Sequence, residues 1–212
     1  MADAEERPNR LHQLLFGAIS MAGPRIQRRV LRSYFDLWHL RPDPWSVTVD
    51  PYERAKYAAT LEQVPGTEYR AILDMGCSEG AFTLLAANAF PEAATVGADI
   101  SARALRRARE QAARTGSGAR FIRMDFMTGD AGGPYDLIFV GEVLYYLGNM
   151  SVVADRLRGL LEPGGHLILT HSRPQARLLH TQFDGHKGFT SVSNTDGDHE
   201  GRFFNVAVYE RV

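Results

Sequence analysis

A short run with two glycines and a nearby acid has the spacing of a nucleotide-type binding turn. The apolar run Ile72-Leu73-Asp74 leads directly into Met75-Gly76-Cys77-Ser78-Glu79-Gly80. Glycine after a strand lets the backbone turn tightly and lets a ligand approach main-chain amides. Asp99 follows 19 residues beyond Gly80, at the end of the next apolar run, where a carboxylate can accept both hydroxyls of a ribose. These residues predict a site for a ribose-containing ligand.

The charge and glycine spacing of the turn narrow the class of ligand. Dinucleotide folds need Gly-x-Gly-x-x-Gly so that a pyrophosphate can rest on a helix N-terminus, and this turn lacks that spacing. Glu79 stands at the start of the following helix, where its charge opposes a pyrophosphate but suits a ligand with cationic groups. We expect Cys77 to be a small packed residue that contributes its backbone amide.

Alternating strands and helices must position these residues. Five apolar runs predict strands at 71–74, 95–99, 121–124, 137–140 and 166–170, and helices are predicted between them at 81–90, 101–115 and 151–161. This alternation indicates a parallel sheet covered on both faces. Residues 188–193 and 202–211 predict a final antiparallel hairpin with its turn at 194–198.

Helical patterns also precede the first strand. Apolar residues at helical spacing predict helices over 11–19, 26–38 and 51–63, and the second of these carries an arginine stripe from Arg25 to Arg32 that we expect to face solvent. We therefore expect two parts in one compact domain, an N-terminal helical lid over 1–69 and a core over 70–212.

Composition limits the alternatives. The chain has 212 residues, 44% of them hydrophobic, and a formal net charge of -1. A nucleic-acid binder normally carries a basic surplus, so no nucleic-acid partner is expected. No stretch approaches the apolar length of a membrane span. The single cysteine cannot form an internal disulfide, which indicates a cytoplasmic location.

The order of these motifs resembles the class I S-adenosylmethionine-dependent methyltransferases. Residues 74–80 resemble their motif I with Ser78 in place of the middle glycine, and 135–140 and 161–167 resemble their fourth and fifth strands. The resemblance implies an α/β, Rossmann-like, seven-stranded fold, S-adenosyl-L-methionine as cofactor and S-adenosyl-L-homocysteine as product. The cofactor-binding residues that it implies are Asp74, Gly76, Cys77, Gly80, Asp99, Ile100, Asp125, Phe126 and Gly141.

Four segments look like the NodS-type family, which is typified by nodulation protein S. They are Asp43-Pro44-Trp45, the run from Tyr52 to Tyr57, Cys77-Ser78-Glu79-Gly80, and the run from Glu142 to Tyr146. This likeness implies a small-molecule acceptor with an amino group, such as an amino sugar. The Asp/Asn-Pro-Pro-Tyr motif of enzymes that methylate nucleobases or glutamine amides does not follow the fourth strand.

Candidate residues for the acceptor come from the lid and from the strand ends. The predicted substrate-binding residues are Trp45, Tyr52, Lys56 and Tyr146, which offer aromatic faces and a charge. An amine must be unprotonated to attack a methyl group, so a base near pH 7 is useful. His171, just past the fifth strand, is the preferred base, and Glu142 is the second choice. The histidines have no metal-ligand spacing, so no metal is expected.

Two alternatives stay open at this point. The first is an O-methyltransferase acting on a small hydroxylated metabolite, for which a base is more necessary. The second is a protein that binds S-adenosylmethionine without catalysis.

Overall fold

A seven-stranded sheet forms the centre of the computed structural model, which describes residues 24–212. Its strands are β1 (Ala71–Met75), β2 (Ala94–Asp99), β3 (Arg120–Arg123), β4 (Tyr135–Gly141), β5 (Leu161–Ser172), β6 (Phe189–His199) and β7 (Arg202–Arg211). They lie in the order β3-β2-β1-β4-β5-β7-β6. The first five are parallel, and β7 runs antiparallel between β5 and β6. The predicted mostly parallel sheet with a terminal hairpin is confirmed.

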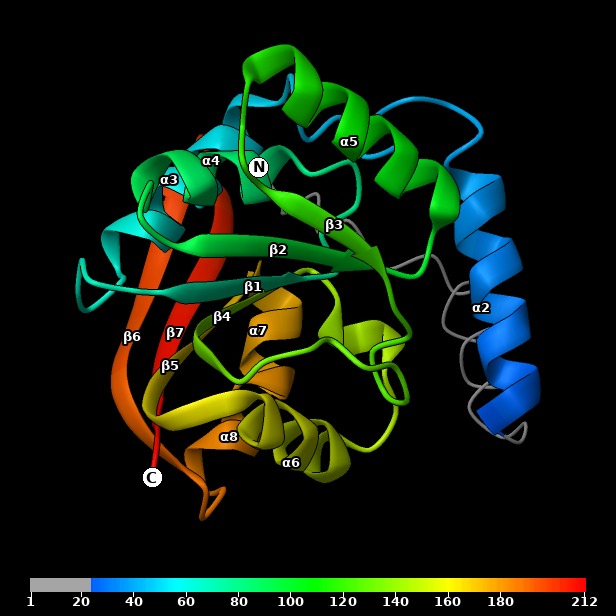
Figure 1. The fold of residues 1–212 in the computed structure, drawn as a ribbon. Helices are drawn as coiled ribbons and strands as arrows, with labels where there is room; N and C mark the ends of the chain where they lie inside the picture. The colour runs from blue at the N-terminus through cyan, green and yellow to red at the C-terminus, as the bar shows by residue number, and fades with distance from the viewer. Residues whose placement is uncertain (1–23) are drawn as a thin grey trace.

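Helices cover both faces of this sheet (Figure 1). On one face lie α3 (Pro51–Glu62), α4 (Ala81–Ala89) and α5 (Ala102–Thr115); on the other lie α6 (Met150–Leu160), α7 (Arg173–Leu179) and α8 (Thr181–Asp184). The sequence did not predict α7, α8 or the single 3-10 turn η1 (Leu144–Tyr146). The helix expected over 11–19 lies outside the described residues.

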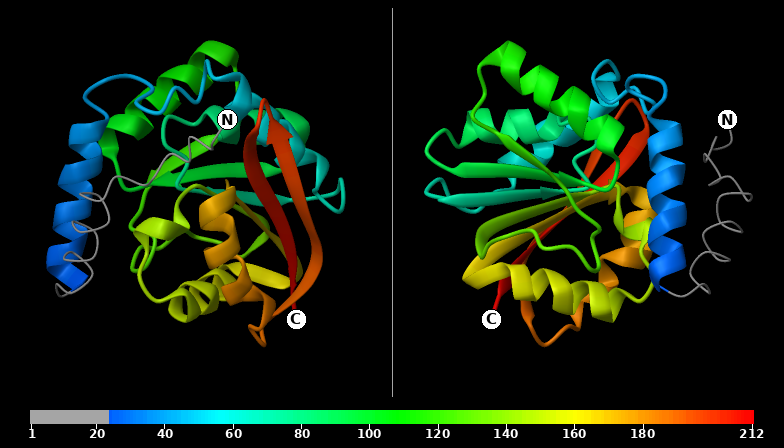
Figure 2. Two further views of the ribbon diagram at one scale, coloured as in Figure 1. Left: turned by 180° about the vertical axis from the view of Figure 1, so that it is seen from behind. Right: turned by 45° about the vertical axis from the view of Figure 1, so that its right-hand side comes forward.

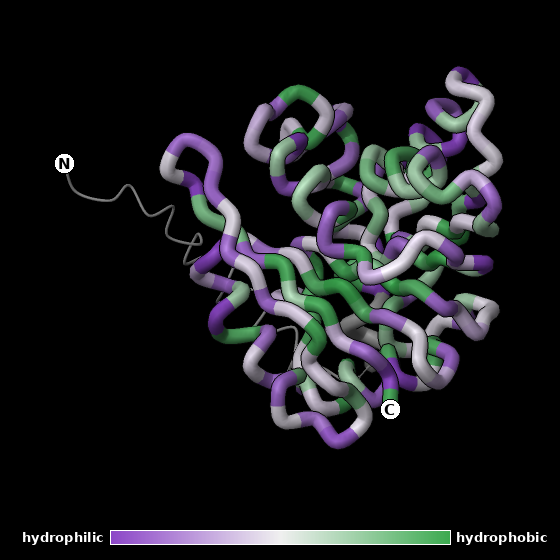
Figure 3. Tube along the Cα trace, turned by 90° about the vertical axis from the view of Figure 1, so that its left-hand side faces the viewer, coloured by the Kyte–Doolittle hydropathy of each residue, from purple (hydrophilic) through white to green (hydrophobic). Residues whose placement is uncertain are grey.

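Strand alternation divides the core into two layers. Ile72 packs with Leu137 under α3 and α4, whereas their neighbours Leu73 and Ile138 pack on the opposite face with α6. Successive side chains of a strand point to opposite faces, so a run of apolar residues fills both layers at once. The hydropathy-coloured trace accordingly shows hydrophobic residues gathered in the middle of the strands and hydrophilic residues at the turns (Figure 3).

Local signals set where the helices begin. The side chain of Ser101 accepts a hydrogen bond from the amide of Ala104 and caps α5, as predicted. Asp50 caps α3 in the same way through the amide of Tyr52, with Pro51 in the first turn. As a result, α3 and α5 both begin near the carboxyl ends of β1 and β2.

The first described helix, α2 (Pro24–Trp38), stands beside the sheet and covers neither face (Figure 2). Its residues Leu31 and Phe35 line a cavity at the carboxyl ends of the strands. Placement of a helix over these ends agrees with the expected lid, whereas the division of the chain at residue 70 stays a prediction. Within the described part of the chain, no helix combines the length and apolar character that a membrane crossing needs.

The hairpin differs from its prediction. Residues 194–198, expected as the turn, belong to β6, and the chain reverses at Glu200-Gly201, where φ is 53° and 80°. Two positive φ values suit the tight turns that join twisted antiparallel strands. The polar residues at 194–198 are tolerated in a strand because β6 is the sheet edge and most of its side chains face solvent.

Candidate functional site

A large cavity opens where the strand order reverses. After β1 the chain crosses to β2 on one side of the sheet, and after β4 it crosses to β5 on the other side, so the strand order reverses between β1 and β4. Ligands commonly bind at such a switch point in a parallel sheet. The cavity has a volume of about 1680 Å³. Typical ligand pockets measure about 300–1,000 Å³, so this one has room for two ligands side by side.

The glycine turn borders this cavity closely. Gly76 has a φ of 82°, and a Cβ added there would lie 2.6 Å from the Val143 side chain. Gly80 has the same φ and would place a Cβ 2.8 Å from the Phe121 ring, but it does not line the cavity. Gly76 thus lets the chain turn with a positive φ and lets Val143 pack directly against the backbone beside the cavity, while Gly80 is the residue before α4.

Asp99 lies at the end of β2 and lines the cavity. Its carboxylate accepts hydrogen bonds from the amide of Ser101 at 2.7 Å and from the amide of Ser78 at 2.9 Å. Burial raises the pKa of Asp99, and these two amide bonds act in the opposite direction. The amides of Ser78 and Ser101 therefore hold the Asp99 side chain next to the glycine turn.

Asp74 is a buried acid in β1 that also lines the cavity. Burial raises its pKa to about 7, although the hydroxyl of Thr83 donates to it at 2.5 Å. No cationic side chain pairs with Asp74 among the described ion pairs. A buried carboxyl without a protein cation is a suitable position for a cationic group of a ligand.

Three charged side chains meet where β4 ends. The ammonium of Lys56 lies 2.9 Å from Oε1 of Glu53 and 2.9 Å from Oε1 of Glu142. The amide of Ser172 donates to the same Oε1 atom of Glu142 at 2.7 Å. Because Lys56 and Ser172 both bind Oε1, the other carboxylate oxygen, Oε2, is left for other partners. One cation and two carboxylates give this cluster a net charge of -1, which favours a cationic neighbour.

Burial acts in opposite directions on the pKa values of Lys56 and Glu53 in this cluster. Burial alone would lower the pKa of Lys56, but Glu142 and Glu53 together raise it, so the ammonium keeps its proton. Burial raises the pKa of Glu53, and Lys56 opposes that shift. Lys56 therefore acts as a fixed charge that holds Glu142 and is not available as a base.

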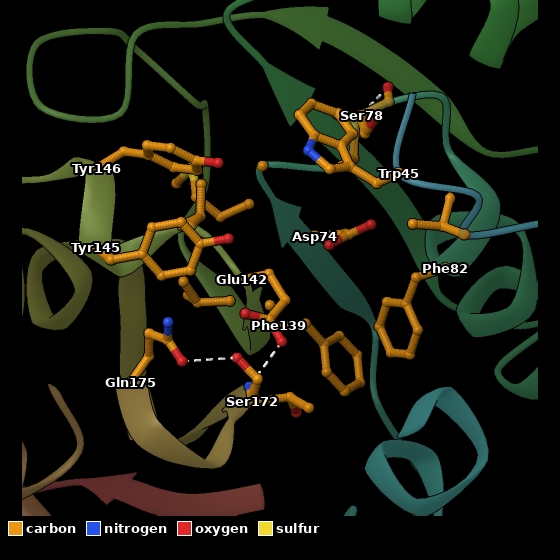
Figure 4. Close-up of a pocket in the computed structure, with 18 of the residues that line it drawn as sticks. Trp45, Asp74, Ser78, Phe82, Phe139, Glu142, Tyr145, Tyr146, Ser172 and Gln175 are labelled. Carbon is orange, nitrogen blue, oxygen red and sulfur yellow. Dashed lines mark hydrogen bonds between the residues drawn. The ribbon is translucent and has the colours of Figure 1, made fainter. Parts of the chain in front are cut away.

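Aromatic rings form the remaining walls of this end of the cavity (Figure 4). Tyr145 and Tyr146 lie with ring centroids 4.4 Å apart, and Trp45 lies across the cavity from them. Burial raises the pKa of Tyr146 to about 12 and that of Tyr145 well above its usual value. At neutral pH these phenols are hydrogen-bond donors and cannot serve as bases.

The expectation for His171 needs a correction. Its ring is fully buried and does not line the cavity, although its neighbours Thr170 and Ser172 do. Alternation along β5 explains this, because the side chain between two cavity-facing residues points to the opposite face of the sheet. A base must reach the proton that it takes, so this position does not suit His171 to that role.

The other predicted residues line the cavity, but one of them, Asp125, also has a structural role. In Asp125, Oδ1 accepts from the amides of Met127 and Thr128, so this acid caps its own loop. The remaining predicted residues that line the cavity are Trp45, Tyr52, Lys56, Cys77, Ile100, Phe126, Gly141, Glu142 and Tyr146.

Sequence reasoning missed His39 and the role of Glu53. His39 is buried, lines the cavity and lies 3.0 Å through Nε2 from the hydroxyl of Ser78. It directly follows α2, and no signal near it in the sequence points to Ser78. Glu53 could have been found from its spacing, because residues three apart such as Glu53 and Lys56 share one helix face.

A buried ion pair fixes the N-terminal segment to the glycine turn. Arg107 of α5 donates to Glu79 at 2.7 Å and to the carbonyl of His39 at 2.9 Å. Glu79 is almost fully buried and also accepts from the amide of Asp43. The acid that sequence analysis placed at the helix start thus has a partner inside the protein.

Replacing Arg107 by alanine is expected to lower the free energy of unfolding by about 3 kcal/mol, because it leaves the Glu79 carboxylate buried without its cation. Urea unfolding measures this loss. Arg106→Ala is the matched control, since Arg106 forms an exposed 3.7 Å ion pair with Glu110 and should cost no more than about 0.5 kcal/mol. Equal losses in the two variants would contradict a role for the buried pair.

Comparisons with known proteins identify the family of this chain. Residues 67–204 match the methyltransferase domain family. Trans-aconitate 2-methyltransferase from Methylobacterium radiotolerans is 37% identical over 124 residues, which cover 55% of this chain and 44% of that protein. Nodulation protein S from Rhizobium tropici is 32% identical over 136 residues, covering 62% of this chain and 56% of that protein. The chain spans about half the length of these curated relatives.

Solved structures agree with the expected fold. The N-methyltransferase NodS from Bradyrhizobium japonicum WM9, solved in complex with S-adenosyl-L-homocysteine, superposes with a TM-score of 0.71 at 25% identity, covering 85% of this chain and 97% of that chain. Magnesium protoporphyrin IX methyltransferase from Synechocystis PCC 6803 superposes with a TM-score of 0.64 at 17% identity and supports the fold alone. The resemblance to NodS-type proteins inferred from the sequence is confirmed.

Proposed function

Because the chain belongs to the methyltransferase domain family, as a class I S-adenosylmethionine-dependent methyltransferase resembling nodulation protein S, we propose that it methylates the amino group of a small molecule. The single observation that carries the choice of an amine is the carboxylate of Glu142, held in the cavity wall with Oε2 left for a partner. A cytoplasmic location, which suits the single free thiol of Cys77, is part of this proposal.

The residues at one end of the cavity fit the cofactor. Asp99, fixed by two backbone amides, would accept the ribose hydroxyls, and Asp74 would face the ammonium group. Gly76 would let the main chain turn beside the cofactor, since its φ of 82° is a conformation that other residues rarely adopt. When bound, S-adenosylmethionine supplies an electrophilic methyl group on a sulfonium sulfur.

At the other end, the chain's own groups would bind and orient the acceptor. The net negative cluster of Lys56, Glu53 and Glu142 attracts an ammonium, and Oε2 of Glu142 can take a proton from it so that the nitrogen lone pair becomes free. Tyr145 and Tyr146 cannot take that proton, because burial raises the pKa of each phenol and each therefore still carries its own proton at neutral pH. Alignment of two reactants in a closed cavity can supply about 7–11 kcal/mol of the barrier reduction.

A transfer assay with matched acceptors tests this proposal. We expect methyl-labelled S-adenosylmethionine to label primary amines such as glucosamine, and not N-acetylglucosamine or glucose, which lack a free amino group. Label in glucose would instead indicate O-methylation of a hydroxyl, and label in trans-aconitate would indicate a carboxylate acceptor. Cofactor binding without transfer to any amine, alcohol or acid in the panel would favour a binding protein.

The pKa of Asp74 gives a prediction for cofactor binding. At pH 6 this carboxyl is mostly protonated and must release its proton before it can pair with an ammonium, so affinity should rise about tenfold between pH 6 and pH 8. Calorimetry with S-adenosylhomocysteine in buffers of different ionisation enthalpy should detect the released proton near pH 7.

The Asp74→Asn variant is the control for this linkage, because its amide cannot titrate. Proton release that persists in Asp74→Asn would assign the linkage to another group. No proton release in the unsubstituted protein would contradict a raised pKa at Asp74.

A further inference from the structure

Two buried histidines that take no part in the cavity chemistry belong to a continuous chain of hydrogen bonds. The amide of Leu144 donates to Nε2 of His171 at 3.4 Å, and Nδ1 of His171 lies 2.9 Å from Nε2 of His180. Nδ1 of His180 lies 2.8 Å from Oδ1 of Asn205, and Nδ2 of Asn205 donates to Oδ1 of Asp196 at 3.0 Å and to Oδ1 of Asn194 at 2.6 Å. The chain runs from the η1 turn through the protein interior to the exposed edge strand.

Both ends of this chain fix the protons between them. The carboxylate of Asp196 can only accept, so the amide nitrogen of Asn205 faces it and the Asn205 oxygen faces His180. His180 must then donate from Nδ1 and, if neutral, accept at Nε2 from Nδ1–H of His171. That leaves Nε2 of His171 as an acceptor, which is what the amide of Leu144 requires from the other end.

Every donor in the chain therefore points the same way, from Leu144 toward Asp196. Hydrogen bonds aligned in this manner polarise and strengthen one another in a low-dielectric interior. A second proton on either ring would set two donors against each other. Burial lowers the pKa of both His171 and His180, which keeps both rings neutral.

The two ends of the hydrogen-bond chain reach two neighbouring parts of the cavity wall, the η1 turn and α7. Leu144 begins the η1 turn that carries Tyr145 and Tyr146, and the His171 ring lies with its centroid 6.1 Å from that of Tyr145. Asp196 also pairs at 3.1 Å with Arg173, which lines the cavity from α7. The hydrogen-bond chain and this ion pair together connect the tyrosine turn with the cavity wall that follows β5.

We propose that His171, His180 and Asn205 are positioning residues, which hold the Leu144–Tyr146 turn against the acceptor end of the cavity. The assignment of that end to the acceptor rests on the proposed function, whereas the hydrogen-bond chain and its hold on the turn do not. A packing role alone would need the volume of the two rings but no particular tautomer. The positioning role requires the Nδ1–H tautomer in both.

Nitrogen NMR of the imidazole rings tests the tautomers without any acceptor. In this protein we expect His171 and His180 to be neutral Nδ1–H tautomers from pH 8 down to pH 7, with their signals assigned from His171→Gln and His180→Gln. The Nε2–H tautomer or a charged ring in either residue at pH 7 would overturn the proposal.

Substitution of Asn205 tests whether the chain acts on the turn. Asn205→Leu removes the acceptor of His180, so we expect the Nδ1–H preference of both histidines to fall and exchange of the Leu144 amide to quicken about tenfold or more. Unchanged exchange of this amide in a folded Asn205→Leu protein would overturn the proposal. Asp196→Ala removes one of the two acceptors of Asn205 Nδ2 and the ion pair with Arg173, whereas the 2.6 Å bond from Asn205 to Asn194 remains, so this variant should quicken the same exchange by a smaller factor.

Asp198→Ala is the matched control for Asp196→Ala, because Asp198 is an exposed acid two residues along the same strand. It should change neither the tautomers nor the exchange, and a change equal to that in Asp196→Ala would overturn the proposal. The KM for glucosamine should rise in Asn205→Leu while the Kd for S-adenosylhomocysteine stays within twofold. If glucosamine is not an acceptor, the proposed function fails at that step, and the NMR and exchange results still decide the positioning role.

Discussion

Replacing Asp99 by alanine is expected to weaken S-adenosylmethionine binding by about 100-fold or more. Hydrogen bonds to a charged acceptor contribute about 1.5–3 kcal/mol each, so the loss of two ribose hydroxyl bonds would cost about 3–6 kcal/mol. Each 1.4 kcal/mol corresponds to about a tenfold change in Kd. The same substitution also removes the acceptor for the amides of Ser78 and Ser101 and so loosens the glycine turn. Calorimetric titration with the cofactor measures the combined effect.

Two further variants separate the charge of Asp99 from its place in the fold. Asp99→Asn keeps an oxygen for one of the two amides, and we expect it to bind more weakly than the unsubstituted protein but better than Asp99→Ala. Asp136→Ala is the matched control. Asp136 also accepts hydrogen bonds from two backbone amides, those of Arg70 and Ala71, but it lies at the amino ends of β1 and β4, away from the cavity. Unchanged affinity in Asp99→Ala, or an equal loss in Asp136→Ala, would argue against Asp99 as the ribose acceptor.

Replacing Glu142 by glutamine is expected to lower kcat by about 10²–10⁴-fold while changing the Kd for S-adenosylmethionine less than threefold. Removal of a group that transfers a proton typically has an effect of this size. The glutamine amide oxygen can still accept from Lys56 and from the amide of Ser172, so the variant should keep its fold. Steady-state rates with the best amine of the transfer assay, together with calorimetry for the cofactor, separate the two quantities.

Glu53→Gln is the control for this prediction. Glu53 shares Lys56 with Glu142, so its substitution changes the charge of the cluster by the same amount without touching Oε2 of Glu142. A loss of kcat in Glu53→Gln as large as that in Glu142→Gln would indicate that net charge matters and that proton transfer at Glu142 does not. Full kcat in Glu142→Gln would remove Glu142 from the mechanism.

The sequence predicted best those features that lie close together in the chain. A strand, a glycine turn and a helix start occupy residues 71–81, and Asp99 ends the next strand, so parallel strand order alone brings Asp74, Gly76 and Asp99 to one edge. Glu142 followed from the same reasoning at the end of β4. These positions depend on local pattern and on the common edge of a parallel sheet, both of which are visible in the sequence.

The features that sequence reasoning missed depend on contacts between distant residues. The hairpin turn was misplaced because polar residues at 194–198 can either form a turn or face solvent on an edge strand, and only the pairing of β6 with β7 decides between them. His171 was expected in the cavity because it follows an apolar strand. Strand alternation relative to Thr170 and Ser172 could have been used, but only with a starting point for the alternation that comes from the structure.

The position of β7 inside the sheet has a consequence for local unfolding. β6 pairs with the sheet only through β7, so an opening of the β5–β7 pairing would release both strands as one unit. Asn205 and Arg202 would leave with them, while β1, β2 and β4 would stay paired. Such an opening would remove Arg202 from the cavity wall, while the strands that carry Asp74 and Asp99 would stay paired.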